Sequence, residues 1–151
     1  MHSFLWIGLV TLSLTACSPS NDADSANKGD SSLKQTDKTQ AYYFLESLKL
    51  VEQSGRQLQN LDRTKVLIDQ ALSAMDDAMS LAFAVDPIFL NGLDVRLGKN
   101  YQRYFIDGVQ IYRLGFESAE QDEQRKGLVL LNHWAQFWDS NRAVILQKIL
   151  S

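Results

Sequence analysis

Apolar side chains recur at steps of three and four residues from Tyr42 onward, and this spacing predicts amphipathic helices. A first helix is expected over residues 41–60. A second helix, with Asp62 as its N-cap, is expected to follow it as far as Asp86. No proline or glycine pair separates the two stripes, so one long helix that bends near Leu61 is the alternative.

The Asp86-Pro87 pair ends the second stripe, because proline disfavours helical geometry in the residue before it and is favoured at the start of a new helix. Residues 88–90 are apolar and are expected to form a short turn that plugs one end of the domain. The Asn91-Gly92 pair supplies a C-cap or turn. Asp94 is then expected to cap a third helix that runs as far as Phe116.

Ser118 and Gln121 have the spacing of a capping box, which predicts that a fourth helix begins there. The sequence Asp139-Ser140-Asn141 interrupts the apolar stripe of this helix, which therefore either continues or restarts at Ser140. No strand-like alternation and no internal repeat accompanies the stripes. The pattern predicts an all-α domain over residues 41–151, built as an antiparallel four-helix bundle.

The N-terminal segment differs from this domain. Phe4 to Leu14 form an apolar stretch of 11 residues in which only Thr11 and Ser13 are polar. At about 1.5 Å per residue, a helix of this length covers only about half of a bilayer core of roughly 30 Å. The stretch is therefore typical of a signal-peptide core rather than of a membrane span.

The apolar stretch ends in Leu14-Thr15-Ala16-Cys17, which resembles the lipobox of bacterial lipoproteins: an aliphatic residue, two small residues and a cysteine. The resemblance implies that residues 1–16 are removed as a signal peptide. It also implies that the Cys17 thiol carries diacylglycerol and that the new amine carries an acyl chain such as palmitate. The segment Met1-His2-Ser3 departs from the usual pattern because it lacks Lys and Arg.

The residue after the cysteine is Ser18 rather than Asp. In enteric-type sorting this implies export to the outer membrane, with the protein on the inner leaflet facing the periplasm, and exposure on the cell surface is the alternative. An ordinary cleaved signal peptide and a short buried helix are the other interpretations of the N-terminal segment.

A polar segment follows the cysteine. Over residues 17–40 only Ala23, Ala26 and Leu33 are apolar, apart from Cys17 and Pro19. Such a composition buries too little surface to offset the entropy of ordering the chain. It predicts an acylated cysteine followed by a disordered tether that ends where the helical domain begins.

Composition narrows the classes of function. The net charge is -3, and no dense Lys/Arg cluster occurs, which argues against nucleic acid as a partner. Cys17 is the only cysteine, so an internal disulfide, a CxxCH haem attachment and a cysteine zinc site are all excluded.

Two glycines stand seven residues apart in the third helix, Gly108 and Gly115. Glycine inside a helix costs about 1 kcal/mol, so the pair predicts either a close approach of two helices or a notch beside aromatic rings. In the second case a groove for an apolar ligand or a partner helix is expected, lined by four aromatic residues. These are Tyr101, Tyr104, Trp134 and Trp138.

A second candidate surface is basic. Arg96, Lys99 and Arg103 follow helical spacing, and Arg113 lies further along the same helix. Such a stripe could contact anionic lipid headgroups or an acidic partner. A simple solvated face is the alternative, because three acidic residues nearly balance the charge. These are Asp94, Asp107 and Glu117.

Catalytic and metal-binding patterns are not found. His133 is the only histidine after the leader, and position 130 is Leu, so the Glu-x-x-His pattern of di-iron bundles is not met. Asp76 and Asp77 are neighbours that point about 100° apart on a helix, which is unsuited to a shared proton. The sequence therefore predicts no metal, no cofactor and no enzymatic activity.

Three functions are compatible with these observations. The first is an envelope lipoprotein that acts as a protein-interaction or assembly accessory, in the manner of the pilotins of secretion systems by analogy only. The second is a carrier or sensor of a small apolar molecule in the predicted groove. The third is a toxin-neutralising or exclusion lipoprotein, which sequence alone does not separate from the first.

Overall fold

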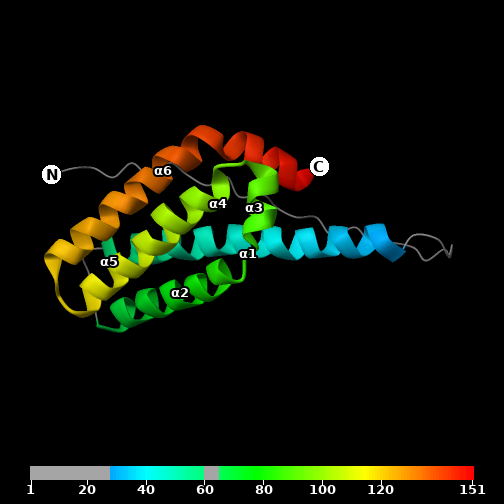
Figure 1. Ribbon diagram of the computed structural model, residues 1–151. Helices are drawn as coiled ribbons and strands as arrows, with labels where there is room; N and C mark the ends of the chain where they lie inside the picture. Colours follow the sequence, from blue (N-terminus) through cyan, green and yellow to red (C-terminus); the bar gives the residue numbers. More distant parts are fainter. Residues whose placement is uncertain (1–27, 60–64) are drawn as a thin grey trace.

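The computed structural model describes residues 28–59 and 65–151, and every regular element within these ranges is helical (Figure 1). The predicted all-α class is therefore confirmed. The elements in chain order are α1 (Lys28–Gln59), α2 (Lys65–Phe83), α3 (Pro87–Leu93), α4 (Leu97–Asn100), the π-helical segment η1 (Tyr101–Ile106), α5 (Asp107–Glu117) and α6 (Gln121–Leu150).

The described helices form two hairpins. The most extensive packing joins α1 to α2 and α5 to α6, and α6 also packs on η1 (Figure 1). The short helix α3 connects the hairpins and lies near the end of α2. This arrangement does not by itself establish the regular four-helix bundle that the sequence predicted, because α3 and η1 interrupt the simple alternation of long helices.

Small residues are buried on both helices of the first hairpin. Ser47 and Ser54 are fully buried on α1, and Ala71, Ala78 and Ala82 are buried on α2. The two serine hydroxyls donate to carbonyl groups of their own helix, each over 2.7 Å. Their polar atoms are thus satisfied inside an apolar contact.

Helix α1 begins earlier than predicted. The sequence placed residues 17–40 in a disordered tether, but residues 28–40 belong to α1. Extending an existing helix costs little once a packed segment has nucleated it, and the segment lacks proline and contains Lys and Gln, which are good helix formers. Residues 17–27, and the predicted cap and bend at Asp62 and Leu61, lie outside the described residues.

The apolar residues 88–90 close one end of the domain, as predicted, but they belong to the helix α3 rather than to a turn. The Asp86 carboxylate accepts the N–H of Ile88 over 2.7 Å, and Pro87 takes the first helical position. Leu90 and Leu93 are buried, so α3 closes one end of the core. The predicted third helix is divided into α4, η1 and α5, and Arg96 rather than Asp94 takes its N-cap position. The Asp94 carboxylate accepts the N–H of Arg96 over 2.8 Å, in the turn before the helix.

The capping box predicted at Ser118 is wrong. Ser118 ends α5, and its hydroxyl donates back to the carbonyl of Leu114 over 2.8 Å. Helix α6 begins only at Gln121. The hydroxyl is therefore used by the helix that precedes it, because the chain must first reverse before α6 can start.

The reversal itself is a Schellman motif. The N–H of Glu120 donates to the carbonyl of Gly115 over 2.8 Å, and the N–H of Ala119 donates to that of Phe116 over 3.4 Å. Ala119 has φ of 58°, the left-handed region in which glycine is usual. The turn is tight although its sequence carries no glycine at that position.

Helix α6 is continuous, so the alternative of a break at Ser140 is wrong. Ser140 donates its hydroxyl to the carbonyl of Gln136 over 2.8 Å, and the Asn141 amide donates to that of Phe137 over 2.7 Å. Both side chains thus bond to the helix that contains them. Such back-bonding bends helices, and α6 curves along its length in Figure 1.

Replacing Ala119 with glycine should stabilise the protein by about 1 kcal/mol, because a left-handed conformation costs an L-residue about 1–2 kcal/mol. Urea unfolding followed by circular dichroism measures this change. The matched control is Ala143→Gly at an exposed position inside α6, which should destabilise by about 1 kcal/mol. Equal effects of the two substitutions would contradict the left-handed assignment.

Candidate functional site

The predicted lipidation site lies outside the described residues, which begin at position 28. The lipidation of Cys17 therefore stays a prediction from the sequence alone. The structure does describe the other two candidate sites, the aromatic groove and the basic face.

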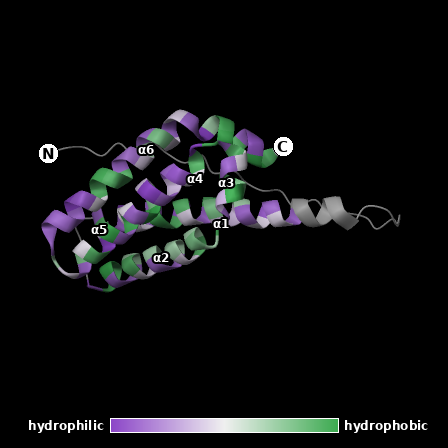
Figure 2. Cartoon of the chain, in the orientation of Figure 1, coloured by the Kyte–Doolittle hydropathy of each residue, from purple (hydrophilic) through white to green (hydrophobic). Residues whose placement is uncertain are grey.

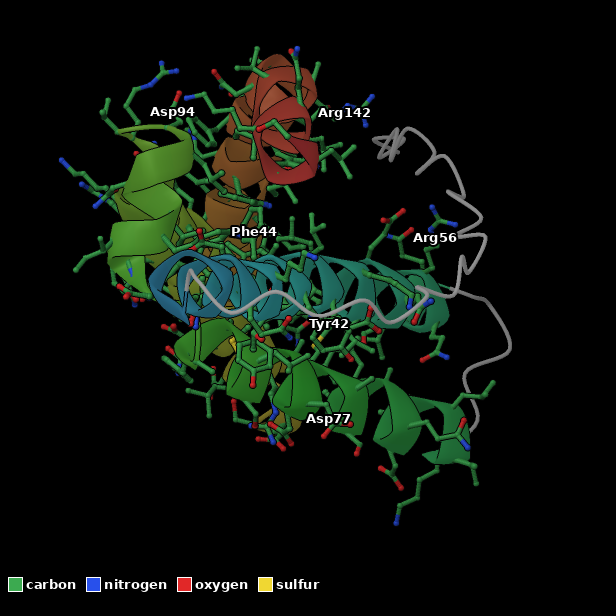
Figure 3. All side chains as sticks on the ribbon, turned by 90° about the vertical axis from the view of Figure 1, so that its right-hand side faces the viewer. Tyr42, Phe44, Arg56, Asp77, Asp94 and Arg142 are labelled. Atoms are coloured by element: carbon green, nitrogen blue, oxygen red, sulfur yellow. The ribbon has the colours of Figure 1, made fainter. Side chains whose placement is uncertain are left out.

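Aromatic rings from three elements meet in the centre of the domain. Tyr101 from η1 is 2% exposed, and its ring centroid lies 5.2 Å from that of Phe44, 5.0 Å from that of Phe105 and 5.6 Å from that of Trp134. Phe44 lies on the side of α1 that faces α6 (Figure 3). Trp138 from α6 completes the cluster, 5.6 Å from Phe44. The rings contact mainly edge to face, which suits their quadrupoles.

The hydroxyl of Tyr101 is satisfied inside this cluster. It lies 2.7 Å from the hydroxyl of Ser47. Ser47 already donates its proton to the carbonyl of Phe44, so Tyr101 is the donor in the pair. Burial raises the pKa of Tyr101 above its ordinary value, and the bond to Ser47 opposes this shift only in part.

Helix α6 covers both glycines of the predicted notch. A Cβ atom added to Gly108 would lie 3.1 Å from the Cβ of Leu130, and one added to Gly115 would lie 2.5 Å from the backbone nitrogen of Gln124. The sequence analysis missed a third member of this contact, Gly127 on α6. Its added Cβ would lie 2.4 Å from the backbone nitrogen of Tyr112.

The six residues of the candidate groove are thus divided between two packing contacts. Tyr101, Trp134 and Trp138 belong to the aromatic core, whereas Gly108 and Gly115 hold α5 against α6. Tyr104 lies at the edge of the core, with its ring 5.3 Å from that of His133. Close helix packing, the alternative weighed from the sequence, accounts for the glycines, and no notch is left open at them.

The candidate basic residues are also separated by their contacts. Arg96 pairs with Asp94 over 3.2 Å, donates to the Asn141 side chain over 2.9 Å and stands over the ring of Phe137. Hydrogen bonds from Arg96 hold the pKa of Asp94 below its usual value. Arg96 therefore joins the start of α4 to α6 instead of standing free on a charged surface.

Arg113 links the two hairpins. Its Nη2 donates to the Asp76 carboxylate on α2 over 2.9 Å, while its Nε lies 2.8 Å from the other oxygen without a well-directed hydrogen bond. Glu117 approaches the same guanidinium within 3.1 Å. Of the remaining two, Arg103 stands over the ring of Tyr104, and Lys99 is exposed without an ion pair to any described residue. Two of the four residues, Arg96 and Arg113, are thus engaged in ion pairs within the domain.

Two further searches cover only the described ranges. In residues 28–59 and 65–151 no three His, Cys, Asp or Glu side chains are grouped as a metal site would require. None of the helices in that part of the chain combines the length and the apolar composition of a membrane span. Comparisons of the chain with protein-family models, curated proteins and solved structures give no match.

Gly127→Ala should destabilise the domain by about 1–3 kcal/mol, because its methyl group would meet the backbone of Tyr112 and force the helices apart. Gly55→Ala is the matched control, since nothing lies within 4 Å of its added Cβ. That substitution should stabilise by about 1 kcal/mol. Urea unfolding measures both, and a stabilising effect at Gly127 would show that α5 and α6 do not pack as described.

Tyr101→Phe should cost about 1 kcal/mol at neutral pH, because it removes one buried hydrogen bond. The pKa of Tyr101 is higher in the folded protein than in the unfolded chain. The stability that the Tyr101 hydroxyl contributes is therefore fully present below the unfolded-state pKa of about 10, and it is lost as the pH rises above that value. The variant should therefore lose less stability than the parent between neutral and strongly alkaline pH. Urea unfolding at several pH values tests this, with the exposed Tyr42→Phe as control.

Proposed function

We propose that this chain is an outer-membrane lipoprotein that faces the periplasm and acts as a non-catalytic protein-interaction or assembly accessory. The observation that carries the proposal is the tetrapeptide Leu14-Thr15-Ala16-Cys17 directly after the apolar stretch from Phe4 to Leu14. Neither feature is specific alone, but their order and spacing match what a lipoprotein leader requires.

The anchor would fix where the domain acts. Each buried CH₂ group of an acyl chain contributes about 0.8 kcal/mol, so two or three chains on Cys17 hold the protein on the membrane while one chain would exchange. Ser18 in the following position supports the outer membrane as the destination. A helical domain held in this way meets only partners that share its compartment.

The packing of the domain favours an interaction role over a carrier role. The region where an apolar ligand was expected is occupied by Tyr101, Phe105 and Trp134, whose rings contact one another. Helix α6 fills the space beside Gly108 and Gly115. The outer faces of the helices are therefore the better candidates for binding, which supports a protein partner.

Affinity capture of the lipidated protein from detergent-solubilised outer membranes, followed by mass spectrometry, tests the interaction role. We expect one stoichiometric envelope protein that is recovered from the native membrane and also after brief crosslinking in cells. The matched control is the unlipidated domain added to the same extract. Recovery of no stoichiometric partner in either condition would reject the accessory role.

Cys17→Ser should leave the domain folded and release it from the membrane, because the serine hydroxyl does not receive the diacylglycerol. Cell fractionation measures the release, and circular dichroism of the purified protein measures the fold. The control is Ser18→Asp, which should keep the acyl chains but move the protein to the inner membrane. An unmodified sulfur in the mass spectrum of the natural protein, or a chain that still begins at Met1, would overturn the anchor.

A further inference from the structure

Helix α3 lies at the end of the domain from which the first part of α1 projects (Figure 1). A hydrogen bond of 2.5 Å from the backbone N–H of Asp86 to the side chain of Gln40 joins the start of α3 to α1. Lys148 near the end of α6 donates to the carbonyl of Leu93 over 2.6 Å, at the other end of α3. The first part of α1 and the helix α3 therefore lie at the same end of the described domain.

The outer face of α3 is apolar and uncharged. Ile88 is 79% exposed and Val95, just after the helix, is 83% exposed, which are the highest values among the large apolar side chains that the structure describes. Asn91 and Gly92 lie exposed between them, and no residue from Pro87 to Leu93 is charged. Figure 2 shows apolar residues on α3 and near the end of α6, whereas the start of α6 is hydrophilic.

Two acidic residues flank this face, and each accepts a local hydrogen bond. The Asp86 carboxylate caps α3 through the N–H of Ile88, and Asp94 pairs with Arg96. Two exposed aromatic side chains lie close along the chain to the contact between Gln40 and Asp86: Tyr42 follows Gln40 on α1, and Phe83 precedes Asp86 at the end of α2. Aromatic rings of this kind are favoured at the level of lipid headgroups.

The chain between the anchor and α1 is short. Residues 18–27 separate Cys17 from Lys28, and even fully extended they span at most about 35 Å. From Lys28 to Gln40, where α1 contacts the start of α3, the helix adds about 18 Å at 1.5 Å per residue. Acyl chains on Cys17 would therefore keep the end of the domain that carries α3 within about 55 Å of the bilayer. A short tether raises the effective concentration of a surface, so a few apolar side chains suffice for contact.

We infer that the outer face of α3, together with Val95 just after it, rests on the lipid bilayer to which the proposed anchor holds the chain; Ile88 and Val95 are the most exposed large apolar side chains of this surface. The inference rests on the lipid anchor proposed above and adds an orientation to it. Ile88 and Val95 enter the boundary between headgroups and acyl chains, as the apolar faces of interfacial helices do. The end of the domain that holds the α5–α6 turn then points away from the membrane.

Fluorescence quenching in vesicles tests this orientation. Because acylation consumes the only native thiol, Val95→Cys introduces a single reactive site for an environment-sensitive dye. The lipidated variant is reconstituted in vesicles of phosphatidylethanolamine and phosphatidylglycerol. We expect doxyl-labelled lipids to quench the dye and aqueous iodide to quench it several-fold less than the same dye at Val129→Cys, an exposed position on α6. Ile88→Cys is the second test site and should behave as Val95→Cys does.

Every other result of the quenching experiment indicates that the outer face of α3 is covered by something other than lipid, or by nothing. A dye at positions 88 and 95 that iodide quenches as fully as at position 129, on protein that floats with the vesicles, overturns the membrane contact and leaves the anchor intact. Protection from iodide without quenching by doxyl lipid also overturns it and indicates a second copy of the chain. Protein that carries no acyl groups and does not float with the vesicles instead overturns the anchor.

Discussion

The close approach of α5 and α6 is the constraint on which the second hairpin depends. Gly108 and Gly115 lie on α5, and Gly127 lies on α6. At each of these glycines the backbone lies directly against backbone or side-chain atoms of the opposite helix, where an added Cβ atom would be crowded. Glycine weakens an isolated helix by about 1 kcal/mol, and three of them are tolerated because the packing that they allow offsets that cost. The contact also fixes where η1 lies, since η1 continues directly into α5.

The position of η1 in turn brings the two hairpins together. Tyr101 carries a donor into the apolar centre, and only the hydroxyl of Ser47 on α1 is placed to accept it. A different register between the hairpins would leave this group buried and unpaired, at a cost of about 1–3 kcal/mol. The ion pair of Arg113 with Asp76 supports the same register from the surface. The buried hydrogen bond between Tyr101 and Ser47 thus selects one register between the hairpins, whereas the contacts of the surrounding rings stabilise that register without selecting it.

Sequence periodicity predicted the helical class and most of the buried faces, because both follow from local spacing. The periodicity failed at Ser118, which it assigned to the start of the fourth helix. Ser118 instead ends α5, because the chain reverses at Ala119. That reversal was not predicted, since the position carries no glycine. The periodicity also left Gly108 with two interpretations. A glycine can leave an open notch or allow a neighbouring helix to pack closely. Which of the two occurs depends on how the opposite helix is aligned, and the spacing of residues within one helix does not determine that alignment.

A lipid anchor changes what a surface must do to bind. An untethered domain needs a large apolar patch to stay on a membrane, and such patches promote aggregation. If the proposed anchor holds the end of the domain that carries α3 within about 55 Å of the bilayer, the domain starts from a high local concentration, and two exposed aliphatic side chains would be enough to set its orientation. Under this proposal α3 has two roles, because Ile88 is exposed while Leu90 and Leu93 on its other face close the core. Orientation would then come from the helix that closes the fold, and the long faces of the hairpins would be left for the proposed partner.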